Sequence, residues 1–312
     1  MIFLWLATLL PVLYWDAGPE TAAVLQKAGI THIAVPPALE SQWKRLKGVS
    51  TSVVDIKGLT EAPVPSIQRN LNEASATRRP WIDSNGWRFL REPKARFYTK
   101  APGAAAALAA AEAFVFGVES FVQTDEAGLE PLRRMIEFLR QIEDLKLPER
   151  ANIGFIDDGS EESGEIMNLM IRKNLLFRIV AAPDSSLDLN VRPGSKEYPV
   201  AGGFDPEATA QKIRSELTDA RRFLRIYGSE VVIARIAGNQ KQVRVYLLNY
   251  GGSSRSVSDV RLRVLGRYPR HRITMFGTPQ VEPLDYVADT QSTELTIPKL
   301  TAFTVVDLLA GP

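Results

Sequence analysis

The chain contains no cysteine and only two histidines among its 312 residues. The lack of cysteine excludes disulfides, thiolate nucleophiles and the cysteine sets that bind zinc or iron–sulfur clusters. Two histidines are too few for a histidine-rich metal site, and a Ser-His-Asp triad would have to use one of them. His32 lies within "THIAVPP", which reads as a buried strand, and His271 lies in the arginine-rich turn "RYPRHRI". We therefore expect both histidines to be structural.

Nucleotide-binding motifs are missing as well. The sequence has neither the loop G-x-x-x-x-G-K-[ST] nor a G-x-G-x-x-G segment after a strand. These absences argue against kinases, NTPases and dinucleotide-dependent enzymes, and we expect no cofactor. A net charge of +2 provides no general attraction for nucleic acid. Carboxylate chemistry is the class that remains.

The first 18 residues, "MIFLWLATLLPVLYWDAG", form an apolar run that is too short to span a bilayer. The run has the character of a signal peptide, although it lacks a basic start and a clear cleavage site. The alternative is a hydrophobic leader ahead of a first strand, "PVLYWD". We expect a secreted or periplasmic protein without an integral membrane span.

Residues 1–148 alternate between short apolar runs and helical segments that end at glycine, as βα units do. We expect strands in "PVLYWD", "ITHIAVP", "STSVVDI" and "ESFVQTD". The alanine-rich segment "PGAAAALAAAEAFVFG" predicts a helix that approaches a sheet closely, because alanine is the smallest good helix former. Its single charge, Glu112, is expected to face solvent.

Two further modules follow. Residues 149–227 begin after "KLPERAN" and restart with the strand "NIGFIDD", which predicts a small α/β domain. Residues 228–312 contain short strands separated by turns, which predict an antiparallel β-sandwich. The expected fold class is α/β plus all-β, in three domains.

This order of modules resembles the multidomain TIM-barrel glycoside hydrolases of the family 42 β-galactosidase type. The resemblance rests on "RRPWIDSNGW", on "NIGFIDDGS" with "LLFRIV", and on "VYLLNYG" with "AFTVVDLL". It implies a barrel, a small amidotransferase-like domain without amidotransferase activity, and a β-sandwich. A complete barrel needs about 200 to 250 residues, so residues 1–148 are expected to form a truncated or incomplete barrel. The two catalytic glutamates of the family cannot both be matched to positions in this chain.

Acidic residues near expected strand ends are the candidate catalytic groups, because βα barrels gather their active sites there and glycosidic cleavage needs two carboxylates. The candidates are Asp16, Asp83, Asp125 and Glu126, with Trp15, Trp81, Asn85 and Trp87 as candidate sugar-binding residues. Each acid also has a structural interpretation. Asp16 and Asp125 are good helix caps, Glu126 suits the first turn of a helix, and Asp55 fits a solvated strand end.

Two charged clusters allow alternatives. In "FIDDGSEESGE", Asp157 and Asp158 could hold a divalent cation, or Asp158 and Ser160 could shape a loop and cap a helix. The segment "RSVSDVRLRVLGRYPRHR" contains six arginines and predicts a solvated sheet face, with an anionic glycan or a neighbouring subunit as the alternative. Aromatic residues for stacking bases are sparse there, so we expect no nucleic acid partner.

The segment "RRPWIDSNGWRFLREP" has its own two interpretations. Asn85-Gly86 between strand-like residues predicts a type I′ hairpin, in which Asp83 would face Arg88 across the two strands. The alternative directs Asp83 into a cleft as a catalytic residue. We favour the hairpin.

The chain is thus predicted to be a carbohydrate-active, glycoside-hydrolase-like protein whose partner is a glycan and whose mechanism is acid/base hydrolysis. The alternative is a catalytically inactive glycan-binding or assembly protein on a degenerate glycosidase scaffold. A cation-dependent regulatory module using Asp157 and Asp158 is the third hypothesis. The sugar, the linkage and the oligomeric state, a homo-oligomer included, stay open.

Overall fold

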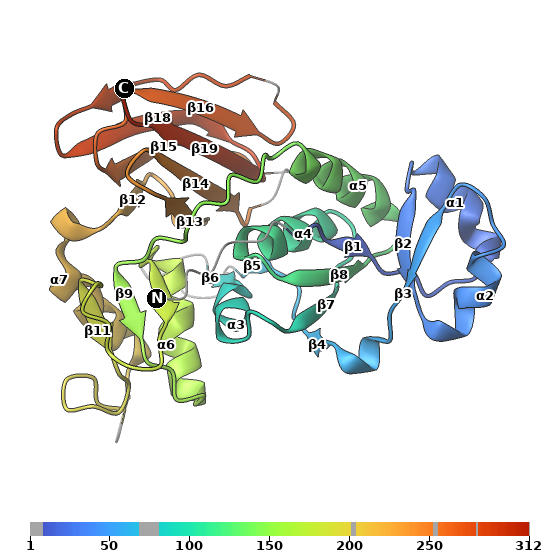
Figure 1. The fold of residues 1–312 in the computed structure, drawn as a ribbon, viewed down its shortest axis with the longest axis horizontal. Helices are drawn as coiled ribbons and strands as arrows, with labels where there is room; N and C mark the ends of the chain where they lie inside the picture. Colours follow the sequence, from blue (N-terminus) through green and yellow to red (C-terminus); the bar gives the residue numbers. More distant parts are fainter. Residues whose placement is uncertain (1–8, 69–80, 201–203, 252–254, 279, 312) are drawn as a thin grey trace, which may run out of the picture. The chain divides into compact units, whose positions relative to one another are not determined.

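The computed structural model describes residues 9–68, 81–200, 204–251, 255–278 and 280–311. The first eight residues of the predicted leader lie outside the described residues. The chain forms two compact units (Figure 1). The βα unit comprises the described parts of Ala7–Ser66 and Glu92–Leu145, and the composite unit comprises those of Ile67–Arg91 and Lys146–Pro312. The bounds of the three predicted domains stay predictions.

The βα unit alternates strands with helices, as its sequence predicts. Its strands are β1 (Val12–Leu13), β2 (His32–Val35), β3 (Ser50–Val53), β4 (Thr60–Glu61), β7 (Arg96–Lys100) and β8 (Glu119–Gln123). Its helices are α1 (Ala22–Lys27), α2 (Glu40–Trp43), α4 (Ala105–Phe116) and α5 (Glu126–Arg140), and short 3-10 turns cover Pro19–Thr21, Pro37–Leu39 and Ile56–Gly58.

The strands of the βα unit are parallel and follow the spatial order β4-β7-β8-β1-β2-β3. Ladders join β4, β7, β8 and β1, and β2 pairs with β3. A single parallel bridge between Tyr14 and Ala34 connects the two groups. Among the described strands β3 and β4 do not pair with each other, so the sheet is an open arc rather than a closed barrel.

Three crossovers between neighbouring strands of this arc run in one direction. The steps β1 to β2, β2 to β3 and β7 to β8 each move one strand the same way along the sheet. Because such crossovers are right-handed, α1, α2 and α4 cover the same face. In addition the last strand, β8, pairs with the first, β1, as the closing seam of a βα barrel does.

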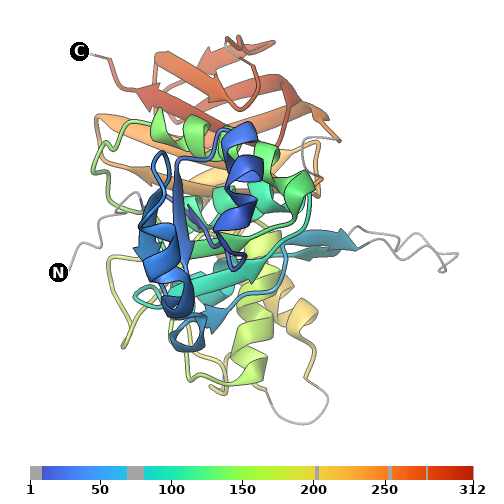
Figure 2. The same cartoon turned by 90° about the vertical axis from the view of Figure 1, so that its right-hand side faces the viewer.

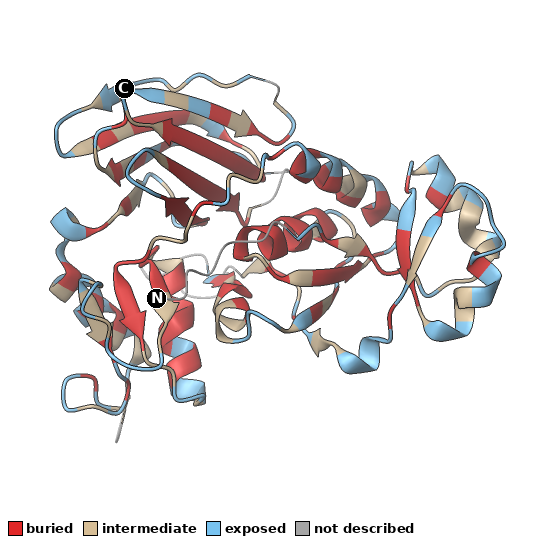
Figure 3. Cartoon of the chain, in the orientation of Figure 1, coloured by how far each residue is buried: buried red, intermediate tan, exposed pale blue. Residues whose placement is uncertain are grey.

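Helix α4 is buried almost all round, which Figure 3 shows as a red helix. It contacts β8 and α5, and its alanines allow both neighbours to approach. The close approach expected of this helix is confirmed. The expectation that Glu112 faces solvent is wrong, because its exposed fraction is 1%.

The composite unit begins with β5 (Ser66–Gln68), β6 (Trp81–Asp83) and α3 (Gly86–Arg91). A small α/β layer follows, with a three-stranded parallel sheet ordered β10-β9-β11. Its elements are β9 (Ile153–Phe155), α6 (Glu161–Arg172), β10 (Phe177–Ile179), β11 (Leu189–Val191) and α7 (Pro206–Arg221). Helix α3 packs on α6, so residues 86–91 belong to this layer although they are distant from it in sequence.

The C-terminal part of the composite unit contains two four-stranded antiparallel sheets. One has the order β12-β15-β18-β17 and the other β13-β14-β19-β16. The strands are β12 (Leu224–Tyr227), β13 (Val232–Gly238), β14 (Gln242–Asn249), β15 (Val257–Leu265), β16 (Arg270–Met275), β17 (Tyr286–Ala288), β18 (Ser292–Leu300) and β19 (Phe303–Leu309).

One hydrophobic core joins these two sheets. It includes Leu262 and Leu295 of the first sheet and Val245 and Val306 of the second, all fully buried. Figure 2 shows these orange-to-red strands turned by 90° from Figure 1. The expected solvated face is confirmed at Arg261, which is exposed, whereas His271 lies in β16 rather than in a turn.

No helix within the described ranges is both long enough and apolar enough to cross a membrane.

Candidate functional site

The face of the βα sheet opposite its helices carries a cluster of aromatic and polar residues. Leu13, Phe97 and Val122 are fully buried on the helix-covered face. Because side chains alternate along a strand, the residues next to Leu13, Phe97 and Val122 lie on the other side. Tyr14 and Tyr98 are two of these residues. We call this side the inner face, since it would line the interior if the arc were a closed barrel.

Two tyrosines and a glutamine are in contact near the carboxyl ends of these strands. The rings of Tyr14 and Tyr98 meet edge to face, with centroids 5.6 Å apart and an interplanar angle of 84°. The Tyr98 hydroxyl donates a hydrogen bond to Oε1 of Gln123, the last residue of β8. This pairing orients two polar groups at the edge of the sheet where βα folds bind their ligands.

Three carboxylates act electrostatically on this pair. Burial, followed by the charges of Asp16, of ionised Tyr14 and of Glu61, raises the pKa of Tyr98 to about 12. Burial, followed by the charges of Asp16 and Asp55, also raises the pKa of Tyr14. The side chains of Asp16, Asp55 and Glu61 are exposed, so negative charge lies around an aromatic pair of which Tyr14 is buried and Tyr98 partly buried.

The connection from β3 to β4 crosses the inner face. Val54 belongs to the same buried cluster as Tyr14, and Leu59 and Tyr98 pack against that cluster. Between them Asp55 accepts a hydrogen bond from the backbone N–H of Lys57 (3.0 Å) and caps the 3-10 turn. The inner face is therefore filled by apolar side chains, and its acidic groups lie at the rim.

Trp15 and Asp16, predicted from the sequence, lie beside this cluster. The Trp15 indole donates to the hydroxyl of Thr21 (2.8 Å), and its backbone N–H donates to the carbonyl of Ala34 (2.8 Å). The capping alternative for Asp16 is wrong, because the cap residue of the following 3-10 turn is Gly18 and no side chain caps it.

Asp125 and Glu126 lie at the start of α5. Asp125 is the N-cap, and its Oδ1 accepts hydrogen bonds from the N–H groups of Gly128 and Gly103, both at 2.9 Å. The capping interpretation is confirmed. Glu126 lines a pocket of about 460 Å³ formed by α1, the turn after it and α5, together with Lys27 and Arg133. The catalytic role of both acids stays a prediction.

The other four predicted residues belong to the composite unit. The hairpin prediction is wrong, because strand β6 leads directly into helix α3 at Gly86. The Ser84 hydroxyl accepts from the Gly86 N–H (3.0 Å), and the N–H of Phe89 donates to the carbonyl of Asn85 (3.0 Å). These bonds form the first turn of a helix, so the register that set Asp83 against Arg88 across two strands does not exist.

The two tryptophans of this segment stack with guanidinium groups. The Arg172 guanidinium lies 3.6 Å from the ring centroid of Trp81, a residue that is 41% exposed. The Arg88 guanidinium lies 4.3 Å from the ring centroid of Trp87. Burial lowers the pKa of Arg172, while the charges of Glu207 and Asp83 act in the opposite direction. A cation therefore covers part of each ring that was predicted to bind sugar.

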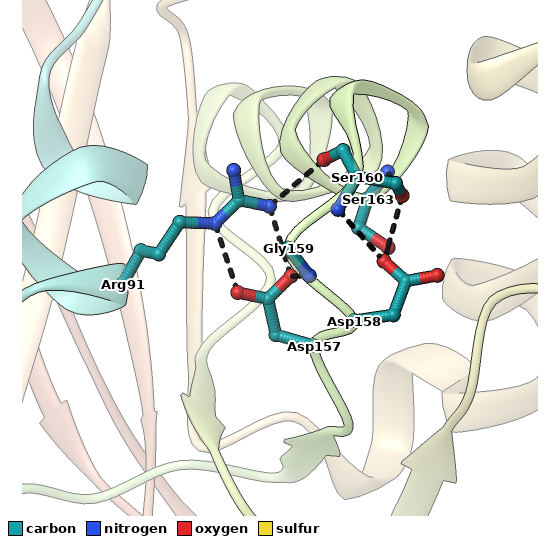
Figure 4. A network of polar contacts seen from close by, with 6 residues as sticks. All are labelled: Arg91, Asp157, Asp158, Gly159, Ser160 and Ser163. Atoms are coloured by element: carbon teal, nitrogen blue, oxygen red, sulfur yellow. Dashed lines mark hydrogen bonds and ion pairs between the residues drawn. The ribbon is translucent and has the colours of Figure 1, made fainter.

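Helix α3 is fixed to the small α/β layer by a largely buried ion pair (Figure 4). Arg91 donates from Nε and Nη2 to the two carboxylate oxygens of Asp157, both at 2.8 Å, and from Nη2 to the carbonyl of Ser160 (3.1 Å). Asp157 also accepts from the N–H of Gly159 (3.1 Å). Both carboxylate oxygens of Asp157 are thus already used within the protein.

Asp158, in the same loop, points to the start of α6 (Figure 4). Its Oδ1 accepts hydrogen bonds from the hydroxyls of Ser160 (2.6 Å) and Ser163 (2.7 Å), which lower its pKa to about 2. Ser160 is the N-cap of α6 and accepts from the Ser163 N–H (3.1 Å). The loop-and-cap interpretation is confirmed, and no group of three metal-binding side chains occurs in the part of the chain that the structure describes.

Comparison with known proteins bears on the fold. No protein-family model matches the chain, and no curated protein matches it either. Among solved structures it is similar to α-L-fucosidase isoenzyme 2 from Paenibacillus thiaminolyticus, with a TM-score of 0.51 at 8% identity over 70% of this chain. The fold is similar to that of a glycoside hydrolase.

The chain spans about three fifths of the length of the fucosidase and of a similar β-galactosidase. It covers 61% of the fucosidase. It also covers 60% of the β-galactosidase from Bacillus circulans sp. alkalophilus, at a TM-score of 0.40, 8% identity and 95% of this chain. The similarity supports a glycosidase-like fold in general rather than family 42 in particular.

The structure thus divides the eight predicted site residues equally between the two units. Trp15, Asp16, Asp125 and Glu126 belong to the βα unit, and Trp81, Asp83, Asn85 and Trp87 to the composite unit. Sequence reasoning missed Tyr14, Tyr98 and Gln123. The available signal was position, since each of them lies within the last three residues of a strand or directly after it.

Proposed function

We propose that this protein binds glycans at the rim of the inner face, on a glycosidase-like scaffold that has lost the enclosed site needed for hydrolysis. The observation that carries the proposal is the filled inner face. Val54 and Leu59 pack with Tyr14 and Tyr98, which leaves Asp16, Asp55 and Glu61 exposed around them. Carboxylates accept hydrogen bonds from sugar hydroxyls, whereas efficient acid/base catalysis benefits from a site that excludes water.

The module order supports the same proposal. An open βα arc, a small α/β layer and two antiparallel sheets with a common core follow one another along most of the chain. We interpret them as a truncated barrel, an amidotransferase-like domain and a β-sandwich of the family 42 type. In such a protein the missing strands of the barrel would remove positions that carry catalytic groups.

Hydrolysis is the second candidate function, and one observation favours it. Asp16 influences both tyrosines, while Asp55 influences Tyr14 and Glu61 influences Tyr98. Carboxylates therefore gather around one locus, as a pair flanking a glycosidic bond must. In this case Asp16 would act with Asp55 or Glu61. The other acids that the sequence suggests, Asp83, Asp125 and Glu126, would be tested for comparison.

A binding and turnover experiment distinguishes the two. Neutral oligosaccharides are titrated into the wild type and into Asp16→Asn, Asp55→Asn and Glu61→Gln, with Glu20→Gln as a matched exposed control. The same proteins, with Asp83→Asn and Glu126→Gln, are tested on chromogenic glycosides. We expect binding to weaken about tenfold in the three rim variants, as for lost hydrogen bonds to charged groups, without turnover in any protein.

Turnover that disappears in Asp16→Asn would establish hydrolysis instead. If the rim variants bind every oligosaccharide as the wild type does, the proposed binding surface is wrong.

A further inference from the structure

A pocket of about 470 Å³ lies among the turns at one end of the two antiparallel sheets. Its polar lining comes from Arg150, Asn239, Gln240, Arg267, Tyr268 and Gln291, and no acidic residue lines it. These residues come from the segment before β9, the β13–β14 turn, the turn after β15 and the turn before β18. The volume is within the range of small-molecule sites.

The two arginines of this pocket have no acidic partner within the described ranges. Arg261 and Arg263 of the arginine-rich segment differ in this respect, because both pair with Glu294. The guanidinium of Arg150 instead lies 4.0 Å from the ring centroid of Phe223, and its Nη1 donates to the Tyr268 hydroxyl (3.4 Å). Its positive charge is thus held in position without being neutralised.

The walls of the pocket are fixed by hydrogen bonds. The N–H of Gly266 donates to the carbonyl of Gln291 (2.8 Å), and the N–H of Tyr268 donates to the hydroxyl of Thr293 (2.9 Å). Gly266 has a φ of +110°, and a Cβ there would lie 3.0 Å from the Tyr268 ring. A site whose groups are ordered before binding loses less entropy when a ligand enters.

The Asn239 turn is ordered in the same way. Oδ1 of Asn239 accepts from the N–H groups of Lys241 (2.9 Å) and Gln242 (3.0 Å), and the N–H of Gly238 donates to the carbonyl of Pro148 (2.8 Å). The N–H of Arg150 donates to the carbonyl of Ile236 (3.0 Å), so the segment that carries Arg150 is attached to the edge of β13. The two arginines are therefore presented by a defined framework.

We propose that this pocket binds an acidic sugar, a hydroxylated ligand that carries one carboxylate or sulfate group. The planar guanidinium forms paired hydrogen bonds with such oxyanions, and the charge of Arg150 and Arg267 selects them. The carboxamides of Gln240 and Gln291 offer donors and acceptors of the kind that sugar hydroxyls require, and the amide nitrogen of Asn239 offers donors. The sugar part of this inference rests on the proposed glycan-binding function, while the anion part rests on the arginines alone.

Calorimetric titration of the full chain tests the pocket. The probes are galacturonate, galactose 6-sulfate, galactose and inorganic sulfate, added to the wild type, Arg267→Gln, Arg150→Lys and Arg150→Gln. Arg261→Gln is the matched control, because it removes an exposed arginine from the same segment. A thermal melt of each variant accompanies the titrations, since Arg150→Gln also removes the contact with Phe223.

We expect one of the two acidic sugars to bind at least about tenfold more tightly than galactose and sulfate, because a hydrogen bond to a charged group contributes that much. The comparison between galacturonate and galactose 6-sulfate identifies the anionic group. Arg267→Gln, whose side chain is exposed, should lose about tenfold in affinity without a change in melting temperature. Arg261→Gln should bind as the wild type does.

Equal affinity for inorganic sulfate and the acidic sugars would overturn the assignment of a sugar ligand. Unchanged binding in Arg267→Gln would overturn the site itself. If instead Arg267→Gln loses the acidic sugar while the inner-face variants bind neutral glycans normally, the rim proposal fails and this pocket stands.

Discussion

Arg91 and Asp157 lie 66 positions apart in the chain and meet as a bidentate ion pair. Their side chains are 19% and 9% exposed. Removal of one member of such a pair leaves the other charge poorly solvated, which is more costly than the loss of an exposed pair. The pair also joins α3 to the loop after β9, so it contributes to the position of the whole segment.

Asp157→Asn should therefore lower the free energy of unfolding by about 3 kcal/mol, because Arg91 keeps its charge in a mostly buried position. Urea denaturation measures this change. In Arg261→Gln, which breaks a pair whose arginine is 50% exposed, the loss should be much smaller, because water screens an exposed pair. Equal losses in both variants would contradict a special role of the buried pair.

Asp158 makes a pH-dependent contribution to stability. Hydrogen bonds from Ser160 and then Ser163 lower its pKa from 3.8 to about 2. A carboxyl whose folded pKa is lowered stabilises the folded state above its unfolded pKa, and this stabilisation disappears as the pH falls through the folded value. The relevant window is therefore from pH 3.8 down to about pH 2.

Ser163→Ala should destabilise the protein at neutral pH and converge with the wild type as the pH falls below about 2, because Asp158 is then protonated in both proteins. Unfolding free energies measured across this range provide the test. Ser215→Ala is the control, since its hydroxyl donates to the Gln211 carbonyl rather than to a carboxylate. A Ser163→Ala deficit that does not change with pH would show that the hydroxyl acts through packing alone.

At the scale of the element, α5 depends on its cap. Asp125 accepts from Gly128 within the helix and from Gly103 in the turn before α4, so one carboxylate orders two segments. Gly128 is part of this arrangement, because a Cβ there would contact Thr124 and would lie 2.8 Å from the Gly103 carbonyl oxygen. The cap therefore couples the end of β8 to the start of α4.

Asp125→Ala should lower the free energy of unfolding by about 1 kcal/mol, whereas Asp125→Ser should retain most of the stability. Thermal or urea denaturation of both variants checks the difference. The two substitutions also separate capping from catalysis. If Asp125 is catalytic, both substitutions abolish activity, because both remove the carboxylate. If Asp125 is only a cap, the alanine substitution alone removes its function.

Most elements were predictable from local pattern. The strand "ESFVQ" and the helix after it follow from apolar periodicity and from Asp125 as cap. The segment around Asn85-Gly86 was not predictable, because turn chemistry favours a hairpin and tertiary contacts favour a helix. Gly164 decides the outcome in part, since a Cβ there would lie 3.0 Å from the Trp87 ring.

The candidate site was less predictable than the fold. Strands such as β2 and β8 have buried residues on both sides, so alternation does not reveal which residues face the helices. The contact between Tyr14 and Tyr98 depends on a pairing of strands from opposite ends of the βα unit. Glu112 shows the same limit, since a lone charge in an alanine-rich segment gives no sign of its buried position.

At the scale of the whole molecule, raised tyrosine pKa values predict sensitivity to alkali. Burial is the largest cause for Tyr98 and Tyr286, both with a pKa of about 12, and burial also raises the pKa of Tyr14, Tyr198 and Tyr246. The ordinary value is 10.0. Between pH 10 and about 12 the unfolded chain loses protons that the folded chain retains, so the free energy of unfolding falls.

A spectroscopic titration of phenolate checks this expectation. Ionisation of these tyrosines should coincide with unfolding rather than precede it, and Tyr286→Phe should make the loss of stability with pH less steep. If all eight tyrosines ionise at the ordinary value while the fold persists, the burial of these hydroxyls is wrong.

Within the described residues the chain passes between the two units three times, near residues 66, 91 and 145, so neither unit is a continuous stretch of sequence. During synthesis β1 cannot pair until Phe121, the partner of Val12, has been made. Arg91 cannot form its ion pair until Asp157, 66 residues later in the chain, has been made. A truncation after residue 145 keeps the whole βα unit but separates Ile67–Arg91 from the rest of the composite unit. The C-terminal half expressed alone lacks this segment and is therefore expected to aggregate, and the composite unit can mature only when the polypeptide is nearly complete.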